Sequence, residues 1–328
     1  MGQSKSKMLS PDAISVKKKG FLYYLKRDWQ LYALLLLPMA FIIVFKYFAY
    51  TGLSVAFLDY KIGKGYAGSK FVGLKVFEKV FKHRDFGKAV ANTLLLNVLD
   101  LLFSFPMPII LALLLNEIRV KWFKRVTQTL LYLPHFLSWV VIGATAYAMF
   151  ATNSGVINTL IANAGKSPIP FLQEDAWWLF SYILIGIWQT MGWGTIIYLA
   201  AITNVNSELY EAAKVDGANR WQQCLHVTLP CIRSTIVVML IMQLGKLMGG
   251  SFERIVALSN AKATEYTTTI PVLVFKWFQG NKFSESTALG LFQSVIGVIL
   301  VVASDKIAKK LGAVSYTHLR AHETSLHL

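Results

Sequence analysis

The chain has 328 residues, of which 55% are hydrophobic and only 15% are charged, and its mean hydropathy is +0.49. Soluble domains carry about a quarter charged residues, so this composition excludes an ordinary water-soluble protein and indicates a surface covered largely by lipid. The formal net charge of +16 is typical of basic loops that face anionic membrane lipid, and we predict no nucleic-acid partner.

The first 28 residues are polar and basic, and we expect them to form a cytoplasmic tail without a cleavable signal peptide. An apolar run at about 30–50 follows, and Lys46 lies near its far end, where a lysine side chain reaches the membrane surface. Residues 29–87 are therefore predicted to form the first transmembrane helix and a basic external loop.

A helix needs about 20 mostly apolar residues to cross a bilayer. We predict an all-α integral membrane protein with six transmembrane helices, at about 30–50, 92–115, 127–150, 177–203, 230–249 and 288–304. The segment 88–312 is predicted to be the transmembrane domain that holds spans two to six. Six spans place both termini on one side of the membrane, and the distribution of Lys and Arg weakly favours the cytoplasmic side.

The loop at 204–229, between spans four and five, is polar and carries the caps of two short helices. Asn206 or Ser207 is expected to cap the first helix. The pair Asp216-Gly217 is predicted to end it, because glycine adopts the left-handed backbone of a helix terminus without a side-chain penalty. Leu229-Pro230 is predicted to end the second helix and to open span five. On these residues alone, the loop is either an ordinary interfacial loop or a docking helix for a partner.

The spacing of this loop resembles that of a known family. The pattern Glu211-Ala212-Ala213, three residues, Gly217, nine residues, Val227, one residue and Leu229-Pro230 is similar to the "EAA" signature of ABC-importer permeases, with valine in place of isoleucine. Blocks such as "FVGLKVFEKVF", "LLYLPHFLSWVV" and "ALGLFQSVIGVILVV" extend the resemblance over roughly 20–312. The resemblance is closest to the branch named for polysaccharide or aldouronate uptake.

This resemblance implies an ATP-driven importer of the bacterial plasma membrane, in which the chain forms the pathway for a carbohydrate and is not itself an enzyme. It implies a second homologous permease subunit, cytoplasmic ABC ATPase subunits and an external solute-binding lipoprotein. The loop would then be the coupling helix that contacts the ATPase. The residues carried over to that motif are Glu211, Ala212, Ala213, Asp216, Gly217, Leu229 and Pro230. A departure is Ser251, where we expect the glycine of a "GFE" block.

Polar and aromatic side chains within spans are candidates for the translocation path. These candidates are Asn97, Asp100, Trp188, Gln189, Trp193 and Lys246. Aromatic rings stack on sugar faces, and amide or carboxylate groups bind hydroxyls, but interhelical hydrogen bonding is the alternative for each residue. His135 is predicted to be a structural histidine with satisfied hydrogen bonds. No acid–base or nucleophile–base set is apparent, so we predict no catalytic residue, cofactor or metal.

Two other segments tempt a functional interpretation. The stretch "NAGKSP", at 163–168, lacks the first glycine of a phosphate-binding loop, so we predict a turn and expect ATP hydrolysis on a separate subunit. The end of the chain, 313–328, resembles the translation of a sequencing-library adapter, and we interpret it as non-native. Its His318, His322 and Glu323 are therefore not assigned to a metal site.

Two alternative functions stay open at this point: a secondary transporter, or an ABC permease for a solute other than a sugar. A secondary transporter usually shows paired helices broken near the middle of the membrane. The "TMGWG" segment of span four is one such hint, and no second segment pairs with it.

Overall fold

The computed structural model describes residues 20–259 and 265–310. Most of the predicted tail at 1–28 and the whole adapter-like end at 313–328 lie outside these residues. The described chain divides after Ser54 into two units. The first unit is helical and comprises α1 (Phe21–Arg27), α2 (Trp29–Ile42), the π-helical turn η2 (Ile43–Tyr47) and the start of the 3-10 helix η3 (Phe48–Phe57).

No residue of α2 is buried within the protein, although the helix is almost entirely apolar. Leu34 is 74% exposed and Leu37 is 77% exposed. Apolar side chains are not left in water on this scale, so α2 presents a surface suited to lipid or to another membrane helix. The continuous helical stretch Trp29–Phe57 is long enough to cross a bilayer.

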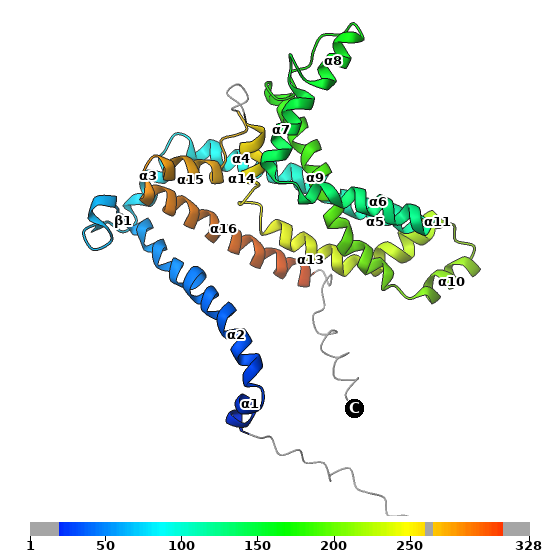
Figure 1. Ribbon diagram of the computed structural model, residues 1–328, viewed down its shortest axis with the longest axis horizontal. Helices are drawn as coiled ribbons and strands as arrows, with labels where there is room; N and C mark the ends of the chain where they lie inside the picture. The colour runs from blue at the N-terminus through cyan, green and yellow to red at the C-terminus, as the bar shows by residue number, and fades with distance from the viewer. Residues whose placement is uncertain (1–19, 260–264, 311–328) are drawn as a thin grey trace, which may run out of the picture. The chain divides into compact units, whose positions relative to one another are not determined.

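The second unit begins with a short antiparallel pair, β1 (Leu58–Asp59) and β2 (Lys70–Phe71), around the 3-10 turn η4 (Ile62–Lys64). All other described elements of the unit are helical (Figure 1). In chain order they are α3 (Lys75–Phe81), α4 (Phe86–Leu99), η5 (Asp100–Ser104), α5 (Pro106–Glu117), α6 (Lys121–Tyr132), η6 (Leu133–Phe136), α7 (Trp139–Phe150), α8 (Val156–Asn163), α9 (Asp175–Thr203), α10 (Ser207–Val215), α11 (Arg220–Gln223), η7 (Cys224–Thr228), α12 (Leu229–Cys231), α13 (Arg233–Leu244), α14 (Phe252–Leu258), α15 (Ile270–Gln279) and α16 (Phe283–Lys310).

Four helical stretches among the described residues are long and apolar enough to span a membrane unbroken. They are Trp29–Phe57, Phe86–Glu117, Asp175–Thr203 and Phe283–Lys310. Two further pairs pass the same test only together, because each is bent at a short break. The count reaches the predicted six when each bent pair is one span, and the all-α membrane fold is thereby confirmed apart from the two-residue strands.

The predicted third span, 127–150, is not one straight helix. Its two halves, Lys121–Phe136 and Trp139–Phe150, meet at 103°. Pro134 lies in the 3-10 turn η6, and Leu137 then takes an extended conformation. The Ser138 hydroxyl caps α7 by accepting a hydrogen bond from the Val141 amide at 3.4 Å. The proline removes a backbone donor and the serine starts a new helix, so the run of apolar residues contains a corner.

The predicted fifth span also begins and ends elsewhere than expected. Pro230 does not end the preceding helix, which continues through α12 to Cys231, and a 61° bend follows at Ile232. A proline ring normally clashes with the carbonyl four residues earlier, here that of His226. His226 lies in the π-helical turn η7, whose wider coil accommodates the ring. The π-helical turn η5 precedes Pro106 in the same way.

The core of the second unit lies between helices that are distant in sequence. Helix α5 packs along α9, α15 along α16, and α14 against α7, as Figure 1 also shows. Trp178 and Tyr182 of α9 are almost fully buried and stack on each other at a centroid distance of 5.1 Å. The Trp178 indole donates a hydrogen bond to the Leu258 carbonyl at 2.8 Å, which fixes α14 against α9.

Candidate functional site

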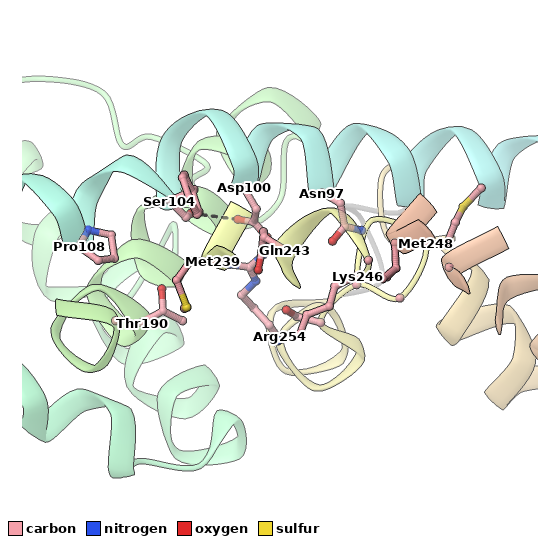
Figure 2. A pocket seen from close by; sticks show the side chains of 18 of the residues that line it. Asn97, Asp100, Ser104, Pro108, Thr190, Met239, Gln243, Lys246, Met248 and Arg254 are labelled. Carbon is pink, nitrogen blue, oxygen red and sulfur yellow. Dashed lines mark hydrogen bonds and ion pairs between the residues drawn. The ribbon is translucent and has the colours of Figure 1, made fainter. Parts of the chain in front are cut away.

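A cavity of about 810 Å³ lies in the second unit between α4, α9, α13, α16 and the chain that connects α13 to α14. Its volume falls within the range of roughly 300–1,000 Å³ that is usual for small-molecule sites. Figure 2 shows side chains from these separate helices converging on the cavity. The wall is mostly apolar, and uncharged polar side chains contribute to it: Asn97, Ser104, Thr190, Gln243, Ser251, Gln293 and Ser294.

The structure brings four of the six predicted translocation-path residues to this cavity. Asn97, Asp100, Trp193 and Lys246 line it, while Trp188 and Gln189 do not. Gln189 is buried within α9, and Trp188 is 43% exposed. Contact of any of these residues with a substrate stays a prediction.

Lys246 does not lie within a helix of span five, as we had expected. Helix α13 ends at Leu244, and the chain turns through residues 245–250 along the wall of the cavity. This segment contains Gly245, Gly249 and Gly250, and Gly250 has a φ of +72°, which an L side chain rarely adopts. The glycines therefore end the helix early and place Lys246 in irregular backbone, which membrane proteins tolerate where it lines a cavity.

An ion pair that the sequence analysis missed joins two walls of the cavity. The Arg254 guanidinium on α14 donates to the Asp100 carboxylate, and both residues are buried. The Ser104 hydroxyl donates to the other Asp100 oxygen at 3.1 Å. The guanidinium also lies 3.7 Å from the centre of the Tyr182 ring. A carboxylate in an apolar span signals a partner, but no sequence pattern indicates one that is 154 residues away.

Two stacked aromatic side chains form part of the cavity wall. The Trp193 and His135 rings stack in parallel, with centroids 4.7 Å apart and planes 8° apart. Trp193 remains 46% exposed, so its ring is only partly covered by the protein. His135 is not the satisfied structural histidine that we predicted, because its buried Nδ1 has no hydrogen-bond partner among the described residues. The imidazole instead supports the indole from η6.

The approach of α9 to α6 depends on Gly192. A methyl group at this position would overlap the Leu131 carbonyl, a backbone atom that has no rotamer by which to move away. We expect Gly192→Ala to lower the free energy of unfolding by about 1–3 kcal/mol, as overpacking usually does. Thermal unfolding in detergent measures this, with Gly290→Ala as the control, because no atom lies within 4 Å of a methyl group there. Equal melting temperatures of the two variants would contradict the prediction.

The loop at 204–229 forms two short helices with defined termini. Asn206 caps α10, since its side chain accepts a hydrogen bond from the Glu208 amide at 3.0 Å. Helix α10 ends at Val215, and the predicted pair Asp216-Gly217 follows, with Gly217 at a φ of +79°. The amides of Gly217 and Ala218 donate back to the Lys214 and Ala213 carbonyls, in a Schellman motif. Reciprocal hydrogen bonds between Asn219 and Gln222 then start α11.

Two side-chain contacts hold this loop together, and a third attaches it to a membrane helix. The Tyr210 hydroxyl bonds the Thr228 hydroxyl at 2.9 Å, which joins α10 to η7. Gln223 donates to the Ala218 carbonyl at 2.8 Å within the loop. Arg220 forms an ion pair with Glu117 at 2.6 Å, which ties α11 to the end of α5. The loop is therefore joined directly to one membrane helix, α5, by a side-chain ion pair.

The outer surface of α10 carries no partner within the described residues. Glu211, Ala212, Asp216 and Gly217 are exposed, and Ala213 is half-buried. The small side chains leave the backbone open to close approach by another surface. A hollow of about 320 Å³ beside them is lined by Ala213, Asp216, Gly217, Ala218, Gln222, His226 and Val227. Leu229 and Pro230, the end of the motif, lie in α12 and do not line this hollow.

Comparison with known proteins supports the membrane architecture. A family described as "Binding-protein-dependent transport system inner membrane component" matches residues 104–311. The polygalacturonan/rhamnogalacturonan transport system permease protein YteP of Bacillus subtilis (strain 168) is 43% identical, over 90% of this chain and 92% of the relative. Protein LplB of the same organism is 42% identical, over 92% of this chain and 95% of the relative.

Solved structures of transporters also support this membrane architecture. A chain from the crystal structure of a bacterial ABC transporter involved in the import of the acidic polysaccharide alginate matches with a TM-score of 0.80 and 36% identity. The match covers 88% of this chain and 98% of that chain. A second structure, the alginate transporter in complex with a pentasaccharide-bound periplasmic protein, matches with the same TM-score over 89% of this chain. The chain therefore belongs to the family of binding-protein-dependent transport system inner membrane components, as a multi-pass permease subunit of an ABC importer and not an enzyme.

Proposed function

We propose that this permease carries a carbohydrate, an oligosaccharide or a related sugar, through the cavity of the second unit. The observation that supports this most is the combination of an exposed Trp193 ring, backed by His135, with amide and hydroxyl side chains on the facing helices. An aromatic plane binds the apolar face of a sugar ring, and amides and hydroxyls exchange hydrogen bonds with its hydroxyl groups. The names of the similar proteins, which concern polysaccharides, support the same assignment.

The complete importer would contain a second homologous permease, two cytoplasmic ATPase subunits and an external solute-binding lipoprotein. The exposed, unpartnered surface of α10 supports its role as the coupling helix, with Glu211, Ala212, Ala213, Asp216 and Gly217 against the ATPase. This assignment places the loop 204–229 and both termini in the cytoplasm. We propose the same division of the chain as the sequence analysis does: a tail at 1–28, a first helix with its external loop at 29–87 and a transmembrane domain at 88–312.

Transport could be driven by ATP or by an ion gradient, and an uptake experiment distinguishes the two. We expect the complete transporter in proteoliposomes to take up a labelled oligosaccharide only with ATP and with the binding protein outside. An ionophore that collapses ion gradients should leave this uptake unchanged, since the ATPase subunits supply the free energy. Uptake that continues without ATP and stops with the ionophore would show a secondary transporter instead, and ATP-driven uptake of a non-sugar solute alone would exclude the carbohydrate.

A further inference from the structure

The hairpin formed by β1, η4 and β2 is fixed to the start of a membrane-spanning helix. The Ser284 hydroxyl, in the first turn of α16, donates a hydrogen bond to the Leu58 carbonyl at 2.6 Å and accepts one from the Tyr60 amide at 3.0 Å. The Tyr60 ring also meets the Phe283 ring edge to face, with centroids 6.0 Å apart. Figure 1 shows β1 beside this end of α16. Because α16 is long and apolar enough to cross a bilayer, its first turn and the attached hairpin lie at the membrane surface.

Large apolar side chains of this hairpin and the turn after it face outwards. Phe71 and Leu74 are each 71% exposed, and Ile62 and Tyr66 are exposed as well. Water accommodates such a concentration of apolar surface poorly, whereas the boundary between lipid headgroups and acyl chains accommodates it well. The candidate span Trp29–Phe57 ends immediately before the hairpin, so this apolar surface continues from a segment that a bilayer surrounds. Its position therefore favours lipid as the neighbour of these side chains.

The same segment is strongly basic. Residues 58–75 contain four lysines and one acidic residue, Asp59. Asp59 is the cross-strand partner of Lys70, so these opposite charges lie side by side and offset each other. The exposed lysines that remain are Lys61, Lys64 and Lys75. A single exposed lysine is ordinary, but three of them within one apolar segment at the membrane surface form the combination that binds anionic lipid.

Internal contacts hold the turn of the hairpin in one conformation. The Ser69 hydroxyl donates to the Gly65 carbonyl at 2.5 Å and accepts from the Lys61 amide at 3.3 Å. The Tyr60 and Tyr66 rings pack on each other across the turn, with centroids 5.4 Å apart. The lysines are therefore presented from a defined backbone. In the proposed orientation this backbone lies outside the cell, where membrane proteins usually carry fewer basic residues than inside, so a negative counter-charge on the outer leaflet would stabilise it.

We infer that the hairpin and the turn after it, residues 58–75, bind anionic phospholipid at the membrane surface. The exposed apolar side chains enter the headgroup region, and the three remaining lysines pair with lipid phosphates. The attachment of the hairpin to α16 then holds the start of that helix at a fixed depth in the bilayer. A protein partner on the outer face is the alternative occupant, and the attachment at the end of a span favours lipid over it. This inference does not depend on which solute is transported.

The test measures which lipid surrounds the hairpin. A bimane fluorophore is attached to the complete transporter through Ala67→Cys, an exposed position in the turn, after Cys224→Ser and Cys231→Ser remove the free cysteines. The protein is placed in vesicles with equal parts of phosphatidylglycerol and phosphatidylcholine, and only one of the two lipids carries bromine on its acyl chains. Bromine quenches the fluorophore at short range, so the ratio of the two quenching efficiencies reports the lipid enrichment at the hairpin. We expect phosphatidylglycerol to be enriched about fivefold.

Substitutions of the lysines separate their charge from their position. Replacing all three with glutamine should bring the enrichment to about one, whereas replacing all three with arginine should retain it. Among single variants, Lys64→Gln should lower the enrichment. Lys166→Gln removes an equally exposed charge from the turn after α8 and should leave it unchanged. The double variant Ile62→Ser with Leu74→Ser should weaken quenching by both lipids, because the hairpin then leaves the headgroup region.

Three results would overturn the inference. The first is equal quenching by the two lipids in the labelled parent protein, and the second is an unchanged enrichment in the triple glutamine variant. The third is quenching that disappears when the external binding protein is added, which would assign the hairpin to a protein partner. The substituted side chains are exposed, so every variant should keep the melting temperature of the parent. No transport is measured, so the outcome is independent of the proposed carbohydrate function.

Discussion

Replacing Asp100 with alanine is expected to lower the free energy of unfolding by about 3–5 kcal/mol, because the Arg254 guanidinium is then left buried without a counter-charge. Arg254 is only 2% exposed, and its Nε already has no hydrogen-bond partner among the described residues. The Tyr182 ring beneath the guanidinium offers a cation–π contact, which compensates for a small part of the loss. Thermal unfolding of the purified transporter in detergent measures the change.

The double variant Asp100→Leu with Arg254→Met tests whether the cost comes from the unpaired charge. Replacing both partners of a buried pair with apolar side chains is often neutral, so this variant should regain most of the lost stability. The exposed pair of Glu117 with Arg220 is the matched control, and Glu117→Ala should cost less than about 1 kcal/mol. The prediction fails if Asp100→Ala has the melting temperature of the wild type. It also fails if the double variant is no more stable than the Asp100→Ala single variant.

The same ion pair shows where sequence-based prediction ends. The six apolar runs followed from hydropathy, because the bilayer fixes how many apolar residues a helix requires. The ends of α10 followed from Asn206 and Gly217, because caps are local. The pairing of Asp100 with Arg254 depends on how the turn at 245–250 directs α14 back towards α4. That direction is set by packing between distant helices, which no local pattern encodes.

The bends were beyond prediction for a related reason. Pro230 was expected to end its helix, and span three was expected to be one helix with no break at Pro134. Pro230 is accommodated by a π-helical turn and stays within a helix, whereas Pro134 lies beside a 103° corner. The outcome depends on whether neighbouring groups satisfy the freed carbonyls, which is a property of the folded unit. Lys246 was placed on a helix because the effect of three nearby glycines on α13 was not anticipated.

The Gly217→Val variant is expected to reduce uptake about tenfold or more while ATP hydrolysis continues. Gly217 has a φ of +79°, and a left-handed backbone costs an ordinary side chain about 1–2 kcal/mol, more than enough to displace the end of α10. The Schellman hydrogen bonds at Ala213 and Lys214 would open, and the exposed alanine surface would lose its defined position. The ratio of sugar transported to ATP hydrolysed, measured in proteoliposomes, reports this loss.

Gly165→Val is the matched control for this strain. Gly165 has a φ of +75° and, like Gly217, has no atom within 4 Å of an added methyl group, but it lies in the turn after α8. If the position of α10 matters, only the Gly217 variant should lower the transport ratio, and Gly217→Asn should largely restore it, because asparagine tolerates the left-handed region. An equal loss in both valine variants would assign the effect to general strain. A normal ratio in Gly217→Val would refute the coupling role, because α10 transmits force only if its end is held rigidly to η7 and α5 through Tyr210 and Arg220.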